Sequence, residues 1–199
     1  MFSLIPPPPQ SSLLGGKKRG VKTFIPSITE QQIEQLHQYV ESLKIWNQRV
    51  NLISRKDINS IWEHHIFPSL VALNLCQIDQ QNWILDLGSG GGFPAIPIKI
   101  LRPDLQFLLI ESIRKKTLFL RKMITDFELD NMTVLNERIE ISKQNTIYQQ
   151  KFDLITARAV ASIPQLLEWG KPFLKNDGYF LLWKGSSDIE ELKEELGDN

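Results

Sequence analysis

An acid and three glycines recur at every second position in the middle of the chain, at Asp86, Gly88, Gly90 and Gly92. The acid lies in an apolar stretch typical of a buried strand, and a helix could open at Phe93-Pro94. Glycines allow positive φ angles and close approach of the backbone to a ligand. The free N–H groups at the start of the next helix would face an anionic group of that ligand. The pattern predicts a ligand-binding turn between a strand and a helix.

The spacing of the glycines distinguishes between two classes of ligand. A dinucleotide-binding turn has the pattern G-x-G-x-x-G, in which the third glycine allows close packing of the helix. Counted from Gly88, that third position is Phe93, which is too large. Read as D-x-G-x-G-x-G, the fit is complete, and the pattern resembles motif I of class I S-adenosylmethionine (SAM) methyltransferases. An ordinary glycine turn is the alternative.

A second acid follows a second apolar run. Gln106–Ile110 is typical of a buried strand, and Glu111 comes 19 residues after Gly92. An acid near this distance from a glycine-rich turn accepts hydrogen bonds from ribose hydroxyls. A solvated carboxylate at the strand end is the alternative, and the all-apolar strand before Glu111 disfavours it.

From residue 83 onward, short apolar runs alternate with helical patterns. We expect strands at 83–87, 106–111, 132–136, 152–157 and 178–183, and helices near 94–101, 113–127, 139–145 and 163–173. This alternation predicts an α/β fold with a parallel sheet covered on both faces. Right-handed crossovers would bring Asp86–Pro94, Glu111 and Thr156–Arg158 to one edge of that sheet. Asn176–Gly178 is a turn signal before the last strand.

The clearest helix precedes the sheet and runs from Thr29 to about Gln48. Its apolar residues recur at steps of three and four, at Ile33, Leu36, Val40, Leu43, Trp46 and Val50. Thr29 with Gln32 resembles a capping box, in which each residue binds the backbone of the other. The sequence therefore predicts both the helix and the residue at which it starts.

Further helical stretches complete a predicted N-terminal helical layer, residues 27–76. Asp57 is expected to cap a second helix through Trp62, and Pro68 should break or kink it, with a new start that runs to Leu75. We expect three parts in the chain, namely a disordered Pro-rich and basic arm (1–26), this layer, and a SAM-binding methyltransferase domain (80–199). The arm could contact RNA phosphates or remain a solvated tail.

Composition limits the class of protein. The 199 residues include 23 basic and 23 acidic side chains, so the net charge is zero, which disfavours an overtly basic nucleic-acid binder but allows a local basic patch. The single cysteine, Cys76, excludes an internal disulfide and a cysteine-based zinc site, and the three histidines have no metal-ligand spacing. No apolar run reaches the length of a membrane span, and the start lacks the features of a signal peptide. We expect a cytoplasmic monomer without a metal.

Several further motifs accompany the glycine turn. They are Trp46-Asn47, Asn51-Leu52, Leu85–Pro94, Glu111-Ser112, Lys115-Lys116, Arg138–Glu140, Phe152-Asp153, Thr156–Ala161 and Lys184-Gly185. Together they resemble the bacterial 16S rRNA guanine-N7 methyltransferase family, RsmG, also called glucose-inhibited division protein B (GidB). The resemblance extends over residues 27–185. Thr156–Ala161 and the Gly-Gly-Phe-Pro segment are more specific to the family than the glycine turn alone.

The resemblance implies a class I, Rossmann-like SAM-dependent methyltransferase that modifies N7 of a guanine in 16S rRNA, in the 530 loop. The cofactor-binding residues that it implies are Asp86, Gly88, Gly90, Gly92, Phe93, Glu111, Ser112, Ile113, Ile139, Glu140 and Arg158. Phe93 would lie near the methionine end, and Ile113 and Ile139 near the adenine. Without the resemblance, Ile139 reads as core packing and Glu140 as a carboxylate favoured at a helix start.

Two features depart from the family. Its Arg-His-Ile-Leu-Asp-Ser-Leu pattern is His-His-Ile-Phe-Pro-Ser-Leu at residues 64–70, so Pro68 replaces an acid. Only residues 184–199 follow the fifth predicted strand, too few for the helix and two strands that normally complete the seven-stranded sheet. We therefore expect the C-terminal strands to be missing, from a truncated chain or a shortened gene.

The expected chemistry needs no general base, because guanine N7 carries a lone pair. Catalysis would depend on proximity and orientation, which can supply roughly 7–11 kcal/mol. Arg158 is the residue that we expect to face both SAM and guanine, and a salt bridge to Glu140 or Asp86 is its alternative role. Trp183 could stack on a splayed base or pack in the core.

The partner implied is 16S rRNA or the small ribosomal subunit. One predicted helix carries five basic residues and no acid between 113 and 125, and these residues are Arg114, Lys115, Lys116, Arg121 and Lys122. They are candidates for binding RNA phosphates, or else form a solvated helix face. Other functions stay open, namely a SAM-dependent enzyme for a small molecule and a SAM-binding or RNA-binding module without turnover. A dehydrogenase is disfavoured by Phe93.

Overall fold

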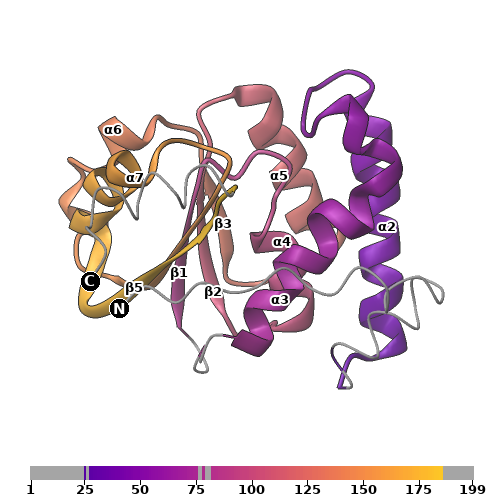
Figure 1. The fold of residues 1–199 in the computed structure, drawn as a ribbon, viewed down its shortest axis with the longest axis horizontal. Helices are drawn as coiled ribbons and strands as arrows, with labels where there is room; N and C mark the ends of the chain where they lie inside the picture. The colour runs from indigo at the N-terminus through magenta and orange to yellow at the C-terminus, as the bar shows by residue number, and fades with distance from the viewer. Residues whose placement is uncertain (1–24, 26, 76–77, 79–81, 186–199) are drawn as a thin grey trace.

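The computed structural model describes residues 25, 27–75, 78 and 82–185 of the chain. The predicted arm, apart from Ile25, lies outside these ranges, as do Cys76 and the residues after Gly185. Within the described ranges, one sheet is flanked by helices on both faces (Figure 1).

The sheet has five parallel strands in the order β3-β2-β1-β4-β5. Their bounds are β1 Trp83–Leu87, β2 Gln106–Ile110, β3 Met132–Leu135, β4 Phe152–Arg158 and β5 Leu174–Trp183. Leu85 of β1 lies opposite Leu108 of β2 and Ile155 of β4, so β1 is central. The predicted parallel α/β sheet is confirmed. All carboxyl ends of the strands lie along one edge, the upper edge in Figure 1.

The predicted turn at Asn176–Gly178 is wrong, because these residues lie within β5. Phe152 pairs with Leu174, but Leu154 pairs with Tyr179, so two steps along β4 match five along β5. The extra residues of β5 therefore form an irregularity in the ladder. A Cβ at Gly178 would lie 2.8 Å from the Leu174 side chain, which explains a glycine there. The residues typical of turns therefore form a bulge in β5 and do not reverse the direction of the chain.

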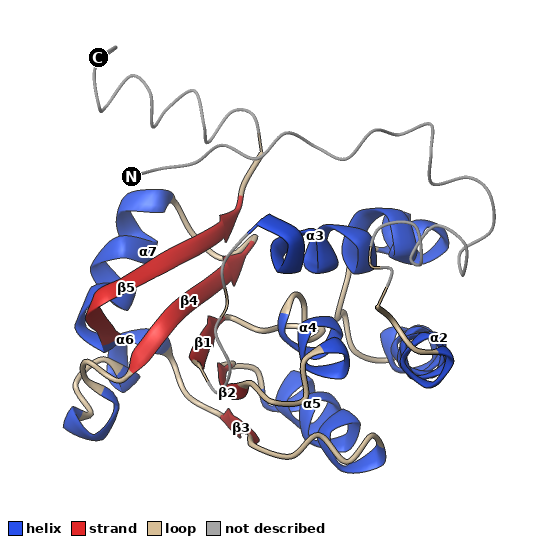
Figure 2. Ribbon diagram, turned by 90° about the horizontal axis from the view of Figure 1, so that it is seen from below, coloured by secondary structure: helices blue, strands red, loops and turns tan. Residues whose placement is uncertain are grey.

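Helices alternate with the strands, as predicted. They are α4 Ala95–Leu101, α5 Arg114–Asp126, α6 Ile139–Ser142 and α7 Ile163–Gly170, with the short turns η3 Thr146–Tyr148 and η4 Lys171–Phe173. Figure 2 shows α4 and α5 on one face of the sheet, together with the N-terminal helices, and α6 and α7 on the other face. The helix expected near 139–145 is shorter in the structure, where α6 has four residues and a turn follows it.

The first N-terminal helix, α2 (Glu30–Asn47), confirms the sequence prediction. The first four residues of its predicted apolar stripe are buried, Trp46 is half-buried, and Val50 lies beyond the helix end. Thr29 and Gln32 form the expected capping box. The Gln32 amide also donates to the carbonyls of Ile100 and Leu101, at 3.0 and 3.2 Å, at the end of α4. One side chain thus caps α2 and fixes it to the helix beneath.

The rest of the layer comprises η1 (Arg55–Ser60), the π-helical turn η2 (Trp62–Ile66) and α3 (Phe67–Leu75). The prediction that Asp57 caps a helix is wrong, because Ser54 is the cap residue and accepts from the Lys56 N–H. Asp57 instead binds His64, at 2.8 Å. The expected change of helix near Pro68 is confirmed, since α3 begins at Phe67.

Side chains of the central strand alternate between two hydrophobic clusters. Ile84 packs with α2, α3, α4 and α5, whereas Leu85 and Leu87 pack with the side of α6 and α7. Asp86 therefore shares the face of Ile84 and is directed toward the N-terminal helices. The helical layer and one face of the sheet share a single core, so these helices contact the edge where the candidate site lies.

Candidate functional site

The glycine turn after β1 is held against the end of β2. The N–H groups of Gly88 and Ser89 donate to the Ile110 carbonyl, at 2.8 and 3.1 Å. Gly88, Gly90 and Gly92 all have positive φ angles. A Cβ at Gly88 would lie 2.7 Å from the Val160 side chain, so a larger residue there would be both strained and crowded. The helix that follows begins at Ala95, with Pro94 as its cap residue.

Asp86 is completely buried beneath this turn. Its Oδ1 accepts from the Thr156 hydroxyl, at 2.6 Å, and the Ser89 hydroxyl donates to the Asp86 carbonyl. Its Oδ2 has no hydrogen-bond partner among the described residues. Burial raises the pKa of Asp86 to about 7, against the lowering effect of the Thr156 and Ser89 hydroxyls. The site therefore contains a buried carboxyl group whose second oxygen has no partner among the described residues.

The Glu111 carboxylate connects two turns at this edge. Its Oε2 accepts from the Gly90 N–H at 2.9 Å, and its Oε1 accepts from the Ile113 N–H at 2.8 Å. The residue is only 5% exposed. Each carboxylate oxygen has a further lone pair, so both can still accept from ligand hydroxyls. Glu111 thus contacts the glycine turn directly, which sequence spacing alone did not predict.

The other residues expected near an adenine differ in exposure. Ser112 and Glu140 are exposed, whereas Ile139 is buried in the cluster that packs with α6 and α7. Ile113 is 49% exposed, which is unusual for a large apolar side chain and leaves an apolar surface beside Glu111. Asn136 was missed from the sequence. Its amide donates to the carbonyls of Glu111 and Ser112, and its position directly after β3 was the available signal.

Arg158, at the end of β4, is directed toward the N-terminal helices. Its Nη2 donates to the His64 carbonyl, and its buried Nη1 has no partner in the part of the chain that the structure describes. Neither predicted salt bridge, to Glu140 or Asp86, forms. Pro68 explains the contact, because it has no N–H to donate to the carbonyl four residues earlier, that of His64. The arginine thus uses a carbonyl that a regular helix would have occupied.

The N-terminal layer also contacts the glycine turn directly. The Tyr39 hydroxyl of α2 donates to the Gly91 carbonyl at 2.5 Å, and its ring lies 5.5 Å from that of Phe93. Phe93 also contacts His65, and the centroids of these two rings lie 4.8 Å apart. Burial, followed by the charge of Arg158, lowers the pKa of His65 to about 4. Tyr39 was not predicted to be a site residue, because a tyrosine on the apolar stripe of a helix is typical of the hydrophobic core.

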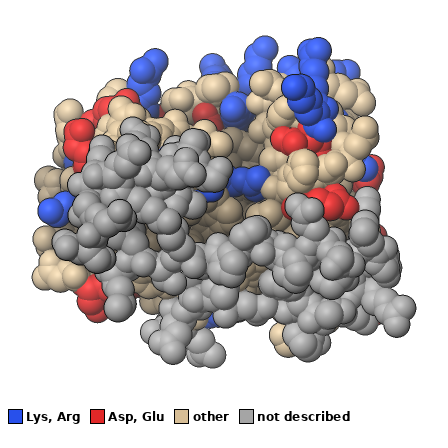
Figure 3. Space-filling model, viewed as in Figure 1, with Lys and Arg blue, Asp and Glu red and all other residues tan. Residues whose placement is uncertain are grey.

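Basic side chains gather along the same edge, the upper one in Figure 3. On α5, Arg114 and Lys115 are exposed, whereas Lys122 pairs with Asp126 at 2.9 Å and Arg121 contacts the Val134 carbonyl. Lys116 is half-buried. The five predicted phosphate-binding residues are therefore not equivalent, since the ones nearest the start of α5 are free of ion pairs within the described chain.

Trp183 does not present its ring for base stacking. Its indole N–H donates to the Pro68 carbonyl at 2.9 Å, and its side chain packs against the shared core. The alternative expectation of core packing describes it better. Lys184 donates to the Ala161 carbonyl, so the end of β5 is fixed to the segment after β4.

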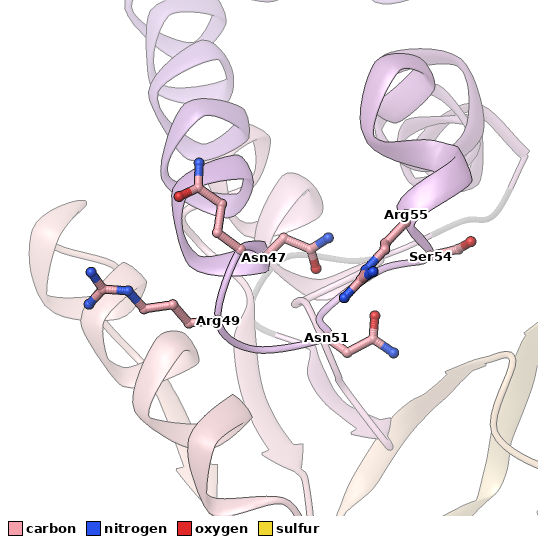
Figure 4. Close-up of a pocket in the computed structure, with 6 residues that line it drawn as sticks. Asn47, Arg49, Asn51, Ser54 and Arg55 are labelled. Carbon is pink, nitrogen blue, oxygen red and sulfur yellow. The ribbon is translucent and has the colours of Figure 1, made fainter.

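A polar pocket lies beside the glycine turn, where the chain passes from α2 to η1 (Figure 4). Its volume is about 710 Å³, and its lining residues are Asn47, Gln48, Arg49, Asn51, Ser54 and Arg55. Sequence analysis singled out Asn47 and Asn51 as family marks but not the two arginines. None of the helices in the described ranges is long and apolar enough to cross a membrane.

Comparison with known proteins gives a consistent family. Residues 32–198 match the GidB family model, described as rRNA small subunit methyltransferase G. A ribosomal RNA small subunit methyltransferase G from Lysinibacillus sphaericus is 35% identical over 178 residues, which is 89% of this chain and 73% of that protein. The protein of the same name from Roseiflexus sp. is 40% identical over 165 residues, covering 83% and 70% of the two chains.

Solved structures share the fold at low sequence identity. A SAM-dependent methyltransferase from Aquifex aeolicus has a TM-score of 0.51 at 17% identity, covering 65% of this chain and 78% of that chain. Coclaurine N-methyltransferase bound to N-methylheliamine and SAH has a TM-score of 0.54 at 14% identity, covering 83% and 56%. The fold is therefore that of the class I, Rossmann-like SAM-dependent methyltransferases.

Proposed function

The chain belongs to the GidB family of rRNA small subunit methyltransferase G proteins, and on that premise we propose that it transfers a methyl group from SAM to N7 of a guanine in 16S rRNA. The observation that carries the proposal is the glycine turn at the carboxyl edge, with Glu111 bound to Gly90 beside the buried Asp86. We further propose the 530 loop as target, 16S rRNA or the small subunit as partner, the cytoplasm as location, and a monomer.

The residues at the edge fit SAM. The unpartnered Oδ2 of Asp86 is an acceptor suited to an ammonium group, and the unpartnered Nη1 of Arg158 is a donor suited to a carboxylate or a base oxygen. Glu111 would accept from the ribose hydroxyls, and the exposed Ile113 offers apolar surface to an adenine. Gly88 has no room for a side chain, because Val160 fills the space that a Cβ would need.

Chemistry and positioning are divided between cofactor and protein. SAM supplies an electrophilic methyl group bound to a sulfonium. The protein needs no general base, because guanine N7 has a free lone pair, so its residues must hold the two reactants in line and exclude water. Phe93 is 6% exposed between Tyr39 and His65, and in the proposed site these rings would keep water from the methionine end of SAM.

Recognition of guanine must leave N7 free. Protein donors are therefore expected at O6 or at the Watson–Crick edge. Arg158 is suited to O6, since its Nη1 has no partner in the described structure and its Nη2 is held by the His64 carbonyl. The half-buried His65 stays neutral near pH 7 and adds no charge that would compete with the guanidinium.

The test is methyl transfer from labelled SAM to small-subunit rRNA or particles that lack the modification, followed by nucleoside analysis. We expect N7-methylguanosine, and strong loss of it in Gly88→Asp and Arg158→Ala. Cofactor binding, measured by calorimetry, should be lost in Gly88→Asp. Binding of SAM without transfer to any RNA would overturn the proposal and favour a small-molecule substrate or a module without turnover.

A further inference from the structure

The loop between α2 and η1 forms the polar pocket described above, and its lining carries an unbalanced positive charge. Arg49 and Arg55 are the charged residues of the lining, and no acid lines it. Figure 4 shows the side chains of Arg55 and Asn51 pointing toward one another, whereas Arg49 extends from the other arm of the loop, away from these two side chains. A pocket of this composition suits an anionic, oxygen-rich ligand.

Asn47 gives the pocket a fixed donor. Its Oδ1 accepts from the N–H groups of Leu52 and Ile53, at 2.8 and 3.0 Å, so the orientation of the amide is determined by two backbone donors. Asn47 is only 8% exposed, and the Nδ2 of the same side chain has no hydrogen-bond partner within the described ranges. A buried N–H₂ group without a partner is costly, and a ligand acceptor in the pocket would remove that cost.

The two arginines are available to a ligand. Within the described chain neither forms an ion pair, whereas other basic residues nearby do. Lys44 binds Glu41 at 2.7 Å, and Lys122 binds Asp126 at 2.9 Å. A guanidinium binds phosphate oxygens through two parallel hydrogen bonds, which favours arginine over lysine for such a site.

The pocket is physically connected to the glycine turn. The Leu52 carbonyl lies against that turn, 3.4 Å from the position of a Cβ on Gly91 and 4.0 Å from one on Gly90. Leu52 is itself held by Asn47. A group bound in the pocket would therefore lie close to the reacting end of the site, on the same edge as the basic start of α5 (Figure 3).

We infer that the α2–η1 pocket binds a backbone phosphate of the RNA substrate, next to the nucleotide that is methylated. Arg49 and Arg55 supply the charge, and the Asn47 amide supplies a neutral donor. This inference rests on the proposed function for the identity of the ligand. It differs from the predicted phosphate surface on α5, because it places a contact on the N-terminal layer, beside the cofactor turn.

The test is a double substitution, Arg49→Ala with Arg55→Ala, compared with Lys151→Ala with Lys171→Ala as a control that removes the same number of charges from exposed positions. Lys151 is an exposed cation at the opposite edge of the sheet, before β4. Affinity for unmodified small-subunit rRNA is measured by filter binding over a range of salt, without turnover. We expect the double variant to bind RNA about tenfold more weakly or worse, with a salt slope lower by about one.

Cofactor affinity and thermal stability should be unchanged in the double variant, and methyl transfer should show a raised KM for RNA with kcat retained. RNA affinity and salt slope equal to those of the wild type would overturn the inference, even if methyl transfer is normal. Absence of RNA binding by the wild type would also overturn it. Weaker binding by the double variant, in a protein that transfers no methyl group to RNA, would support the pocket and refute the proposed reaction.

Discussion

Replacement of Asp86 by asparagine should expose a hidden dependence of stability on pH. Between about pH 4.5 and 6.5, the buried Asp86 and the half-buried His65 act in opposite directions on the free energy of unfolding. Burial raises the pKa of Asp86 to about 7 from 3.8, so the folded chain keeps a proton that the unfolded chain has lost. The contribution of Asp86 to stability therefore falls as the pH rises through this range.

His65 has the opposite effect. Burial lowers its pKa to about 4 from 6.5, so in the same range the unfolded chain binds a proton that the folded chain lacks. Its contribution therefore rises with pH. Each slope approaches about 1.4 kcal/mol per pH unit, and in the wild type the two largely cancel. With Asp86→Asn only the rise from His65 remains, roughly 2 kcal/mol over two pH units.

Urea unfolding at half-unit steps of pH measures this directly. Asparagine keeps the acceptor for the Thr156 hydroxyl, so the packing of the site should persist. The complementary variant, His65→Asn, should become less stable as the pH rises over the same range. Parallel stability profiles for the wild type and Asp86→Asn would refute the reasoning, because they would mean that Asp86 does not hold a proton in the folded chain.

Three further substitutions test individual contacts. Tyr39→Phe removes a buried donor to the glycine turn and should lower the free energy of unfolding by about 2 kcal/mol, measured by urea unfolding. The control is Tyr148→Phe, which should have little effect because the Tyr148 hydroxyl has no hydrogen bond in the described chain. Gly88→Ala should destabilise the fold by about 2 kcal/mol or more, from its φ of +67° and the contact with Val160, and Val160→Ala should restore only part of this loss in thermal unfolding. Glu111→Gln should raise the Kd for SAM by roughly 10–100-fold by calorimetry, because a buried carboxylate acceptor is replaced by a partly donating amide, and an unchanged Kd would contradict its role.

Local pattern was sufficient for the framework. The apolar runs and the spacing of Asp86, Gly88, Gly90 and Gly92 predicted the parallel strands and the turn at their carboxyl edge, because burial on both faces and positive φ angles leave direct marks in the sequence. The capping box at Thr29 likewise depends only on residues three apart. The sequence pattern gave a wrong prediction where the same residues are typical of more than one local structure. Asn176–Gly178 are typical of a turn but form a bulge in β5.

The family motifs and the glycine turn were thus determined by the sequence itself, since each depends on neighbouring residues and on backbone conformation. Only the tertiary structure decided how the N-terminal layer completes the site. Tyr39 reaches Gly91 across 52 positions, Arg158 reaches His64 across 94, and Asn47 shapes the loop that packs on the turn. Such contacts arise from the packing of helices on a sheet. The periodicity of the sequence does not predict which distant carbonyl a side chain will bind.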